Sequence, residues 1–212
     1  MNFLAHIYLS GSNVDIRLGN FIGDQVKGNQ ILKYPKRVQQ GIMLHRKIDQ
    51  ATDKHPAWRS CKTILIPSYG RWSSVATDVM FDFILAREWS AYSNRSLKGF
   101  TRTFYFQMLQ RYHMLPLEVR NFLPFLIQSN RLYSYSTDEG ITKALEIMGN
   151  HTTMKGNPAL ALNLVKENYE TFSHGLKELI AELTHMAKKE FGIQIQTSYP
   201  MLENQCFIKF SS

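Results

Sequence analysis

The chain has 212 residues, of which 44% are hydrophobic and 20% are charged. This balance excludes a disordered chain, and the lack of any run of about 18 uncharged apolar residues excludes a transmembrane helix. The formal net charge of +8 indicates either an anionic partner or a solvated basic surface that has no partner. Because the basic residues form no long continuous run, nucleic acid is not favoured as that partner.

Helix signals follow one another along almost the whole chain. Prolines and capping residues at helix starts, with glycine or proline beyond helix ends, predict about eight helices. Their expected ranges are 15–27, 35–54, 56–65, 75–92, 97–114, 116–133, 137–150 and 157–191. Residues 193–195 and 206–210 alternate only briefly, so we treat 193–212 as a tail. The sequence therefore predicts an all-α fold with one helical domain, residues 1–192, followed by this tail.

The amino-terminal residues and the cysteines bear on cellular location. Residues 1–6 contain no basic region followed by an apolar run, so we expect no secretory signal. The two cysteines, Cys61 and Cys206, are far apart and form neither a zinc motif nor a disulfide framework. Such sparse use of cysteine is typical of a reducing compartment, so we expect a cytoplasmic protein that is not attached to a membrane.

One face of the expected helix 35–54 changes from apolar to polar along its length. Val38 and Ile42 begin a stripe at helical spacing that continues with His45 and Asp49. His45 and Asp49 therefore lie where burial is expected. Because an unpaired buried carboxylate is costly, Asp49 needs a cation or a strong hydrogen-bond donor nearby.

Other acids and one histidine interrupt apolar surroundings in the same way. Asp78 and Asp82 lie one turn apart on the apolar face of the expected helix 75–92. Two carboxylates at this spacing repel each other unless a positive group lies beside them. Asp24 ends a glycine-containing stretch of the first expected helix, and His6 lies in an apolar segment.

Together these side chains form one candidate metal centre. The set is His6, Asp24, His45, Asp49, Asp78 and Asp82. Mixed imidazole and carboxylate ligands suit manganese, iron, zinc or magnesium, and such an ion activates water and neutralises a phosphoryl oxygen. The alternative is that each is an ordinary buried polar residue that hydrogen-bonds to a helix end or pairs with an arginine. Arg46 and Arg87 are the obvious candidates for such pairing.

Several short motifs follow one another in a distinctive order. The most specific are the opening Asn-Phe-Leu-Ala-His and a His-Arg-x-Ile-Asp block. The set comprises Asn2–His6, Gly19–Asp24, Val26–Asn29, Gly41–Ile42, His45–Asp49, Thr52–Asp53, Asp78–Asp82 and Trp89, and more weakly Leu132–Tyr133, Tyr135 and Ile147–Gly149. With these motifs, which span about residues 1–190, the chain resembles the acyl-carrier-protein phosphodiesterases, also called acyl-carrier-protein hydrolases.

The resemblance implies a fold, a reaction and a partner. The fold is all-helical and related to the HD-type metal-dependent phosphohydrolases. The reaction is hydrolysis of the phosphodiester that joins 4′-phosphopantetheine to a serine of holo-acyl carrier protein, with a divalent metal. Manganese is the usual metal, and magnesium or iron also suits the ligands. Because acyl carrier proteins are acidic, the charge of +8 fits this partner.

The resemblance also assigns roles to individual residues. The family's acids and histidines fall on His6, Asp24, His45, Asp49 and Asp78. We expect these residues to hold the metal, together with Asp82. His6, as a ligand or a proton shuttle, and Asp24 are expected to take part in catalysis. Arg46 is expected to act there too, and Arg46 and Lys27 to bind the substrate by neutralising non-bridging phosphate oxygens.

Two positions depart from the family pattern. Phe83 follows Asp82 where the family often has histidine, and Glu88 precedes Trp89 where histidine is frequent. Two other functions therefore stay open. One is hydrolysis of a nucleotide or another small phosphoester, and the other is a non-catalytic helical module that binds a protein. Hydrolysis assays on a folded carrier protein and on small phosphoesters distinguish the first alternative from the carrier-protein phosphodiesterase. The metal content of the purified protein distinguishes the second, because a non-catalytic module should bind metal weakly or not at all.

Overall fold

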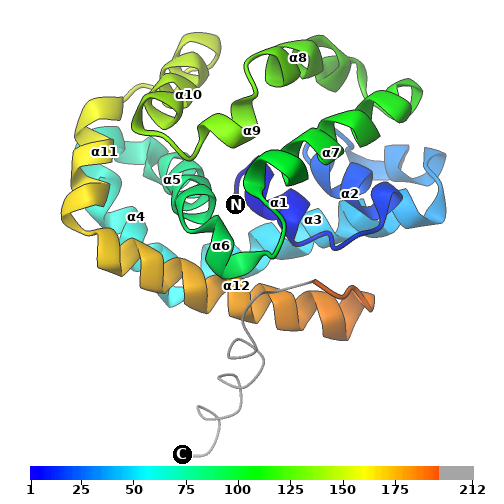
Figure 1. Cartoon of the computed structure of the whole chain (residues 1–212), viewed down its shortest axis with the longest axis horizontal. Helices are drawn as coiled ribbons and strands as arrows, with labels where there is room; N and C mark the ends of the chain where they lie inside the picture. Colours follow the sequence, from blue (N-terminus) through cyan, green and yellow to red (C-terminus); the bar gives the residue numbers. More distant parts are fainter. Residues whose placement is uncertain (196–212) are drawn as a thin grey trace, which may run out of the picture.

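Twelve α-helices and three short 3-10 helices account for most of residues 1–195, the part of the chain that this computed structural model describes (Figure 1). In chain order they are α1 (Phe3–Tyr8), α2 (Val14–Phe21), η1 (Gly28–Lys33), α3 (Lys36–Lys54), α4 (Pro56–Tyr69), η2 (Gly70–Trp72), α5 (Ser73–Arg87), α6 (Trp89–Tyr92), α7 (Leu97–Gln110), η3 (Tyr112–Met114), α8 (Leu117–Gln128), α9 (Arg131–Ser134), α10 (Asp138–His151), α11 (Pro158–Glu167) and α12 (Tyr169–Phe191). No strand occurs within this range, which confirms the all-α prediction. None of these helices is both long and apolar enough to cross a bilayer.

Several helices are longer or more broken than the sequence predicts. The predicted helix 56–65 continues as α4 through Pro67, because a proline near the end of a helix removes one hydrogen bond without undoing the turns already formed. The predicted helices 75–92, 97–114 and 116–133 each end in a separate short helix, namely α6, η3 and α9. The first predicted helix, which was expected to reach Lys27, ends at Phe21 as α2.

The long predicted helix 157–191 is in fact two helices, α11 and α12. They meet at Asn168, whose backbone leaves helical geometry at φ −115° and ψ 29°. The Asn168 side chain donates a hydrogen bond to the carbonyl of Leu164 and so satisfies part of the exposed end of α11. Because of the break, α12 turns away from α11 and runs along the bottom of the view in Figure 1, where it packs against α3, α4 and α5.

The predicted tail begins with residues that belong to the packed structure. Ile193 is buried, and its side chain lies against Gly11. The remainder of the predicted tail, residues 196–212 with Cys206, lies outside the described residues.

Helices α2 and α3 pack closely against each other. A Cβ atom on Gly19 would lie 2.0 Å from the Val38 carbonyl oxygen, and one on Gly41 would lie 2.1 Å from the Ile16 carbonyl oxygen. Only glycine allows two backbones to approach this closely. The crossing places the carboxyl-terminal end of α2 directly beside the middle of α3, where His45 lies.

The molecule has two halves, one built around α2 and α3 and the other around α5. Helix α5 lies at the centre of its half, packed against α4, α10, α11 and α12 (Figure 1). Eleven of its fifteen residues are buried, so it is surrounded by protein on nearly all sides. Helix α1 packs against both α2 and α5 and thereby joins the two halves. The candidate ligands lie at this junction.

Candidate metal centre

Three candidate ligands from two helices meet in space. His6 on α1 places its Nε2 atom 3.1 Å from Oδ1 of Asp49 on α3. His45, one turn before Asp49, places its Nε2 atom 3.1 Å from Asp49 Oδ2. The two imidazole rings stack with their centroids 4.1 Å apart. One ligand atom from each of the three residues lies within 4.8 Å of the other two, which is close enough for one ion to contact all three.

Asp24 approaches this group from the segment that follows α2. Its Oδ1 atom lies 3.2 Å from His45 Nε2. The Asp24 side chain is 70% exposed, whereas the side chains of His6 and His45 are 3% and 8% exposed. Asp24 is therefore the most exposed of these four side chains, and the two histidines are almost completely buried.

Asn20 on α2 holds both imidazole rings in one tautomer. Its Nδ2 atom donates to the His6 carbonyl and to Ser10 Oγ, so its Oδ1 atom faces His6 Nδ1 at 2.8 Å. Its backbone carbonyl oxygen lies 2.8 Å from His45 Nδ1. Because these oxygens only accept hydrogen bonds, each Nδ1 atom carries a proton, so in a neutral ring the Nε2 atom is the one left to bind an ion. Two lone pairs and a carboxylate that converge in this way fit a divalent cation.

Asp78 on α5 lies at the edge of the group, and both Asp78 and Asp49 form an ion pair with the Met1 ammonium group. The Met1 ammonium nitrogen lies 3.3 Å from Asp78 Oδ1 and 3.5 Å from Asp49 Oδ1. Trp58 Nε1 donates a hydrogen bond to Asp78 Oδ1 at 2.8 Å. Burial lowers the pKa of the ammonium, but attraction by Asp78 and Asp49 outweighs burial and raises that pKa. This side of the centre therefore stabilises a cation.

Asp82, which we expected as a further ligand, has a different role. It is fully buried, and its two oxygens accept hydrogen bonds from the backbone N–H groups of Leu4 at 2.7 Å and Ala5 at 3.0 Å. These are unpaired donors of the first turn of α1, so Asp82 caps that helix from α5. Burial raises the pKa of Asp82 to about 7, against the opposing effect of the two N–H donors. Since both oxygens are occupied, we leave Asp82 out of the ligand set.

Replacing Asp82 with asparagine is expected to destabilise the protein by about 2 kcal/mol at pH 8, where the carboxyl group is ionised. An amide has one acceptor oxygen, so its NH2 group would face a backbone N–H group of α1. Urea unfolding of the variant measures the loss, and metal content is measured on the same samples. Unchanged stability together with lower metal content would instead identify Asp82 as a ligand.

The two expected substrate-binding cations lie beside Asp24. Arg46 is exposed, and its Nη2 atom donates to the Val26 carbonyl at 2.9 Å, so it braces the segment that carries Asp24. Lys27 is also exposed. Arg87, the other possible partner for the candidate acids, instead bonds to Asp138 at 2.8 Å.

The two positions that depart from the family pattern lie in different surroundings. Phe83 is completely buried in the core, beneath the guanidinium group of Arg87. Glu88 is partly buried and forms an ion pair with Lys177 at 3.4 Å. Both side chains are thus accounted for by packing and by a local charge pair.

The acid–base properties of the group reflect how its members are paired. Burial lowers the pKa of His45, but contact with Asp24 and Asp49 outweighs burial and raises it to about 9. Burial would raise the pKa of Asp49, yet the two histidines hold it far below its usual range. Burial and the neighbouring His45 lower the pKa of His6. Without an ion, the protein therefore keeps a proton on His45 at neutral pH.

The metal-free protein is expected to lose about 3 kcal/mol of stability as pH rises from 6.5 to about 9. The pKa of His45 is higher in the folded protein than in the unfolded chain. Its stabilising charge is therefore fully present below pH 6.5 and disappears as pH passes the folded pKa. Urea unfolding with a chelator measures this loss. Added Mn²⁺ should remove it, because an ion then replaces the proton on Nε2, and a His45→Gln variant should show a smaller pH dependence. Equal stability at both pH values in the chelated protein would contradict the pairing.

Three contributors to the centre were not in the predicted set. Asn20 is buried, and the signal that the sequence offered was its position next to Gly19 and four residues before Asp24. Trp58 and the Met1 ammonium act through Asp78, and nothing in the sequence pattern links them to it. Gly23 also has a specific task, because a Cβ atom there would lie 2.3 Å from His45 Cγ.

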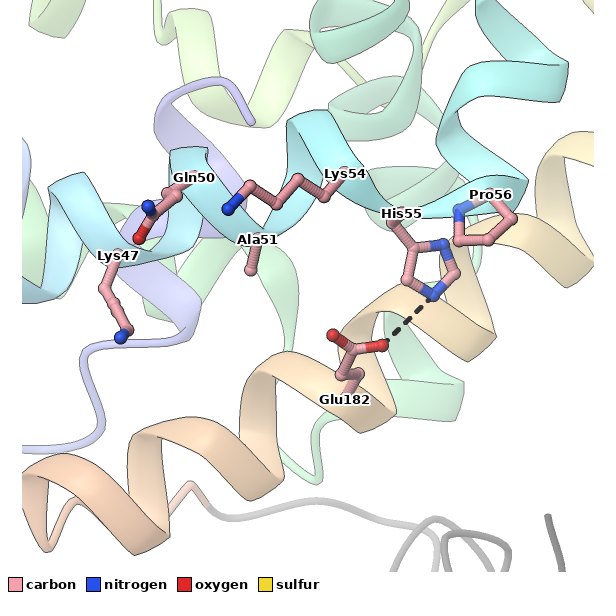
Figure 2. A pocket seen from close by; sticks show the side chains of 7 residues that line it. All are labelled: Lys47, Gln50, Ala51, Lys54, His55, Pro56 and Glu182. Carbon is pink, nitrogen blue, oxygen red and sulfur yellow. Dashed lines mark ion pairs between the residues drawn. The ribbon is translucent and has the colours of Figure 1, made fainter. Parts of the chain in front are cut away.

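A separate hollow of about 290 Å³ lies between α3 and α12 (Figure 2). It is lined by Lys47, Gln50, Ala51, Lys54, His55, Pro56 and Glu182. His55 Nε2 lies 3.5 Å from Glu182 Oε2 across it. No candidate ligand lines this hollow, so the chemistry of the group around Asp49 does not depend on it.

Comparisons with known proteins agree on one family. The sequence model described as "Acyl carrier protein phosphodiesterase" matches residues 1–183. A Serratia proteamaculans protein of that name is 29% identical over 189 residues, which cover 89% of this chain and 98% of the relative. A Yersinia pestis protein of the same name is 30% identical over 171 residues, with coverage of 80% and 89%. No solved structure matches the chain.

Proposed function

Because the family model covers residues 1–183, the chain belongs to the acyl carrier protein phosphodiesterase family, and we propose that it converts holo-acyl carrier protein to the apo form. The bond cleaved is the phosphodiester between 4′-phosphopantetheine and a serine of the carrier protein. The observation that carries the proposal is the convergence of His6, His45 and Asp49 in a chain that matches this family over most of its length. We further propose a cytoplasmic location, which the free, buried thiol of Cys61 supports.

We propose that His6 Nε2, His45 Nε2 and carboxylate oxygens of Asp49 and Asp24 hold a divalent ion, with Asp78 at its edge. When bound, such an ion, for which we propose manganese, activates water for attack on phosphorus and neutralises phosphoryl oxygens. The hydrogen bonds that both Nδ1 atoms donate to Asn20 oxygens leave the Nε2 atoms free of protons in the neutral rings. His6 is almost completely buried, which favours a ligand role over a proton shuttle.

The remaining steps need groups that a bulky substrate can reach. Asp24 is the exposed acid of the group, and we propose that one of its oxygens orients the attacking water and accepts its proton. Arg46 and Lys27 lie at the same exposed side and are proposed to neutralise non-bridging oxygens of the phosphodiester. The bond from phosphorus to the serine oxygen of the carrier protein breaks, that oxygen takes up a proton from solvent, and Asp24 returns the proton it accepted to solvent.

Intact-mass spectrometry of holo-acyl carrier protein tests this proposal directly. The purified protein is incubated with holo-carrier protein and Mn²⁺, with and without chelator. Without chelator, we expect the mass of the carrier protein to fall by the mass of phosphopantetheine. With chelator, we expect its mass to stay unchanged. Bis(p-nitrophenyl) phosphate serves as the small-substrate comparison. If folded, metal-loaded protein hydrolyses the small diester and leaves holo-carrier protein intact, the proposed substrate is wrong.

A further inference from the structure

The positive charge of the chain is concentrated in two segments on either side of Asp49. Residues 25–48 and 54–77 contain ten of the 25 Lys and Arg residues and none of the 17 Asp and Glu residues. The rest of the chain holds 15 basic and 17 acidic residues, a net charge of −2. Although these cations form no continuous run, the whole positive excess of the protein belongs to the two segments that precede and follow Asp49 in the chain.

Contacts place individual cations on two sides of that centre. On the side of Asp24, Arg46 bonds to the Val26 carbonyl, and Lys27 is the next residue of that segment. On the other side, α4 carries Arg59 and Lys62. The Lys62 ammonium lies 5.6 Å from the ring centre of Trp58, whose indole N–H group bonds to Asp78.

Arg59 is held near the centre through α3. Its Nε atom donates to the Asp53 carbonyl at 3.0 Å, one helical turn beyond Asp49. We call Lys27, Arg46, Arg59 and Lys62 the cationic rim. Its members come from the segment before η1, from α3 and from α4.

The cations of the rim are free to meet an external anion. Lys27, Arg46 and Arg59 are exposed and Lys62 is half-buried. None of the four forms an ion pair with another residue in the range 1–195. Cations elsewhere are often neutralised, as where Arg111 pairs with Asp15, Lys166 with Asp138 and Lys177 with Glu88. Exposed or half-buried cations without an acidic partner near the candidate ligands attract an acidic protein to this part of the molecule.

We propose that the cationic rim is the docking surface for the acidic carrier protein, an inference that rests on the proposed function. The phosphodiester is attached to a folded protein, so cleavage requires the carrier's own surface to lie against the mouth of the centre. Cations on both sides of Asp49 are proposed to engage acidic residues on the surface of the carrier. This arrangement aligns the phosphodiester with the ligands, and it raises the association rate at low salt.

The double variant Arg59→Glu/Lys62→Glu tests the rim without touching a proposed ligand or a phosphate-neutralising residue. We expect KM for holo-acyl carrier protein to rise by about 10-fold or more, because repulsion replaces attraction, while kcat changes by less than about two-fold. The neutral pair Arg59→Ala/Lys62→Ala should raise KM in the same direction by less. Metal content and hydrolysis of bis(p-nitrophenyl) phosphate report whether the centre is intact in each variant.

The matched control is Arg102→Glu/Lys143→Glu, which changes the net charge of the protein equally. Both residues are exposed and lie on α7 and α10, helices that contribute no candidate ligand. KM for the control should stay within about two-fold of the unaltered protein at 50 mM salt. The inference is overturned if the rim variant matches the control, or if the control raises KM as strongly as the rim variant.

Failure of the proposed function is distinguishable from failure of this inference. If the unaltered protein does not hydrolyse holo-carrier protein, the function is wrong, and calorimetric titration with apo-acyl carrier protein then decides the docking question alone. Binding that weakens with salt and is lost in the rim variant supports docking. Absence of binding, or equal binding by the rim variant and the control, overturns it.

Discussion

Replacing Asp49 with asparagine is expected to lower kcat/KM on holo-acyl carrier protein by about 10³-fold or more, which corresponds to roughly 4 kcal/mol of transition-state stabilisation. Asp49 is the residue that contacts Nε2 of both His6 and His45. Asparagine keeps the size of the side chain but removes its negative charge and one acceptor oxygen. The proposed ion would then lose the ligand that links the two imidazoles. Steady-state kinetics and metal content of the purified variant measure both effects.

The matched control for this variant is Asp53→Asn, one turn further along α3. Asp53 is exposed, and its side chain forms no ion pair within residues 1–195. The control should keep its metal and its kcat/KM within about two-fold. Asp49→Asn should keep the helical circular dichroism spectrum of the unaltered protein. Metal binding and activity that survive in Asp49→Asn would remove Asp49 from the centre.

Replacing Gly41 with alanine is expected to cost about 3 kcal/mol or more of stability, a large effect for the addition of one methyl group. The new Cβ atom would lie 2.1 Å from the Ile16 carbonyl oxygen, and backbone cannot move aside as a flexible side chain does. Helices α2 and α3 must separate, and Asn20 then moves away from His45. We therefore expect a fall in Tm of about 6–12 °C together with weaker metal binding.

Gly99→Ala is the control for this prediction. Gly99 lies in the first turn of α7, and a Cβ atom there would meet only the Ser96 hydroxyl, at 3.1 Å. Its effect on stability should stay within about 0.5 kcal/mol. If Gly41→Ala is as mild as this control, the close packing of α2 on α3 is not what holds the centre together.

Periodicity identified the side chains that needed a buried partner but not the partner itself. For His45 and Asp49, both on α3, helical spacing alone places the two side chains together, and the structure brings them into contact. Asp82 met the same criterion, yet it caps α1, which lies more than seventy residues earlier in the chain. A buried acid looks the same in the sequence whether an ion or a backbone N–H group satisfies it.

Helix α1 shows why part of the fold was not predictable from the sequence. It has only six residues, too few to be stable on its own propensity, and its first turn depends on Asp82. The segment that contains it was accordingly expected only as an apolar stretch. The long helices α3 and α12 carry extended amphipathic patterns, so their presence was predictable even where the break at Asn168 was not.

The two histidines of the centre differ in how mutation can change them. His6 is oriented by the side chain of Asn20, which a single substitution replaces, whereas His45 is oriented by the backbone carbonyl of the same residue, which every substitution retains. Divergence at position 20 therefore releases one imidazole and leaves the other in place. In the proposed metal centre, such a change would alter the strength or identity of ion binding through His6, while His45 and Asp49 would keep their positions.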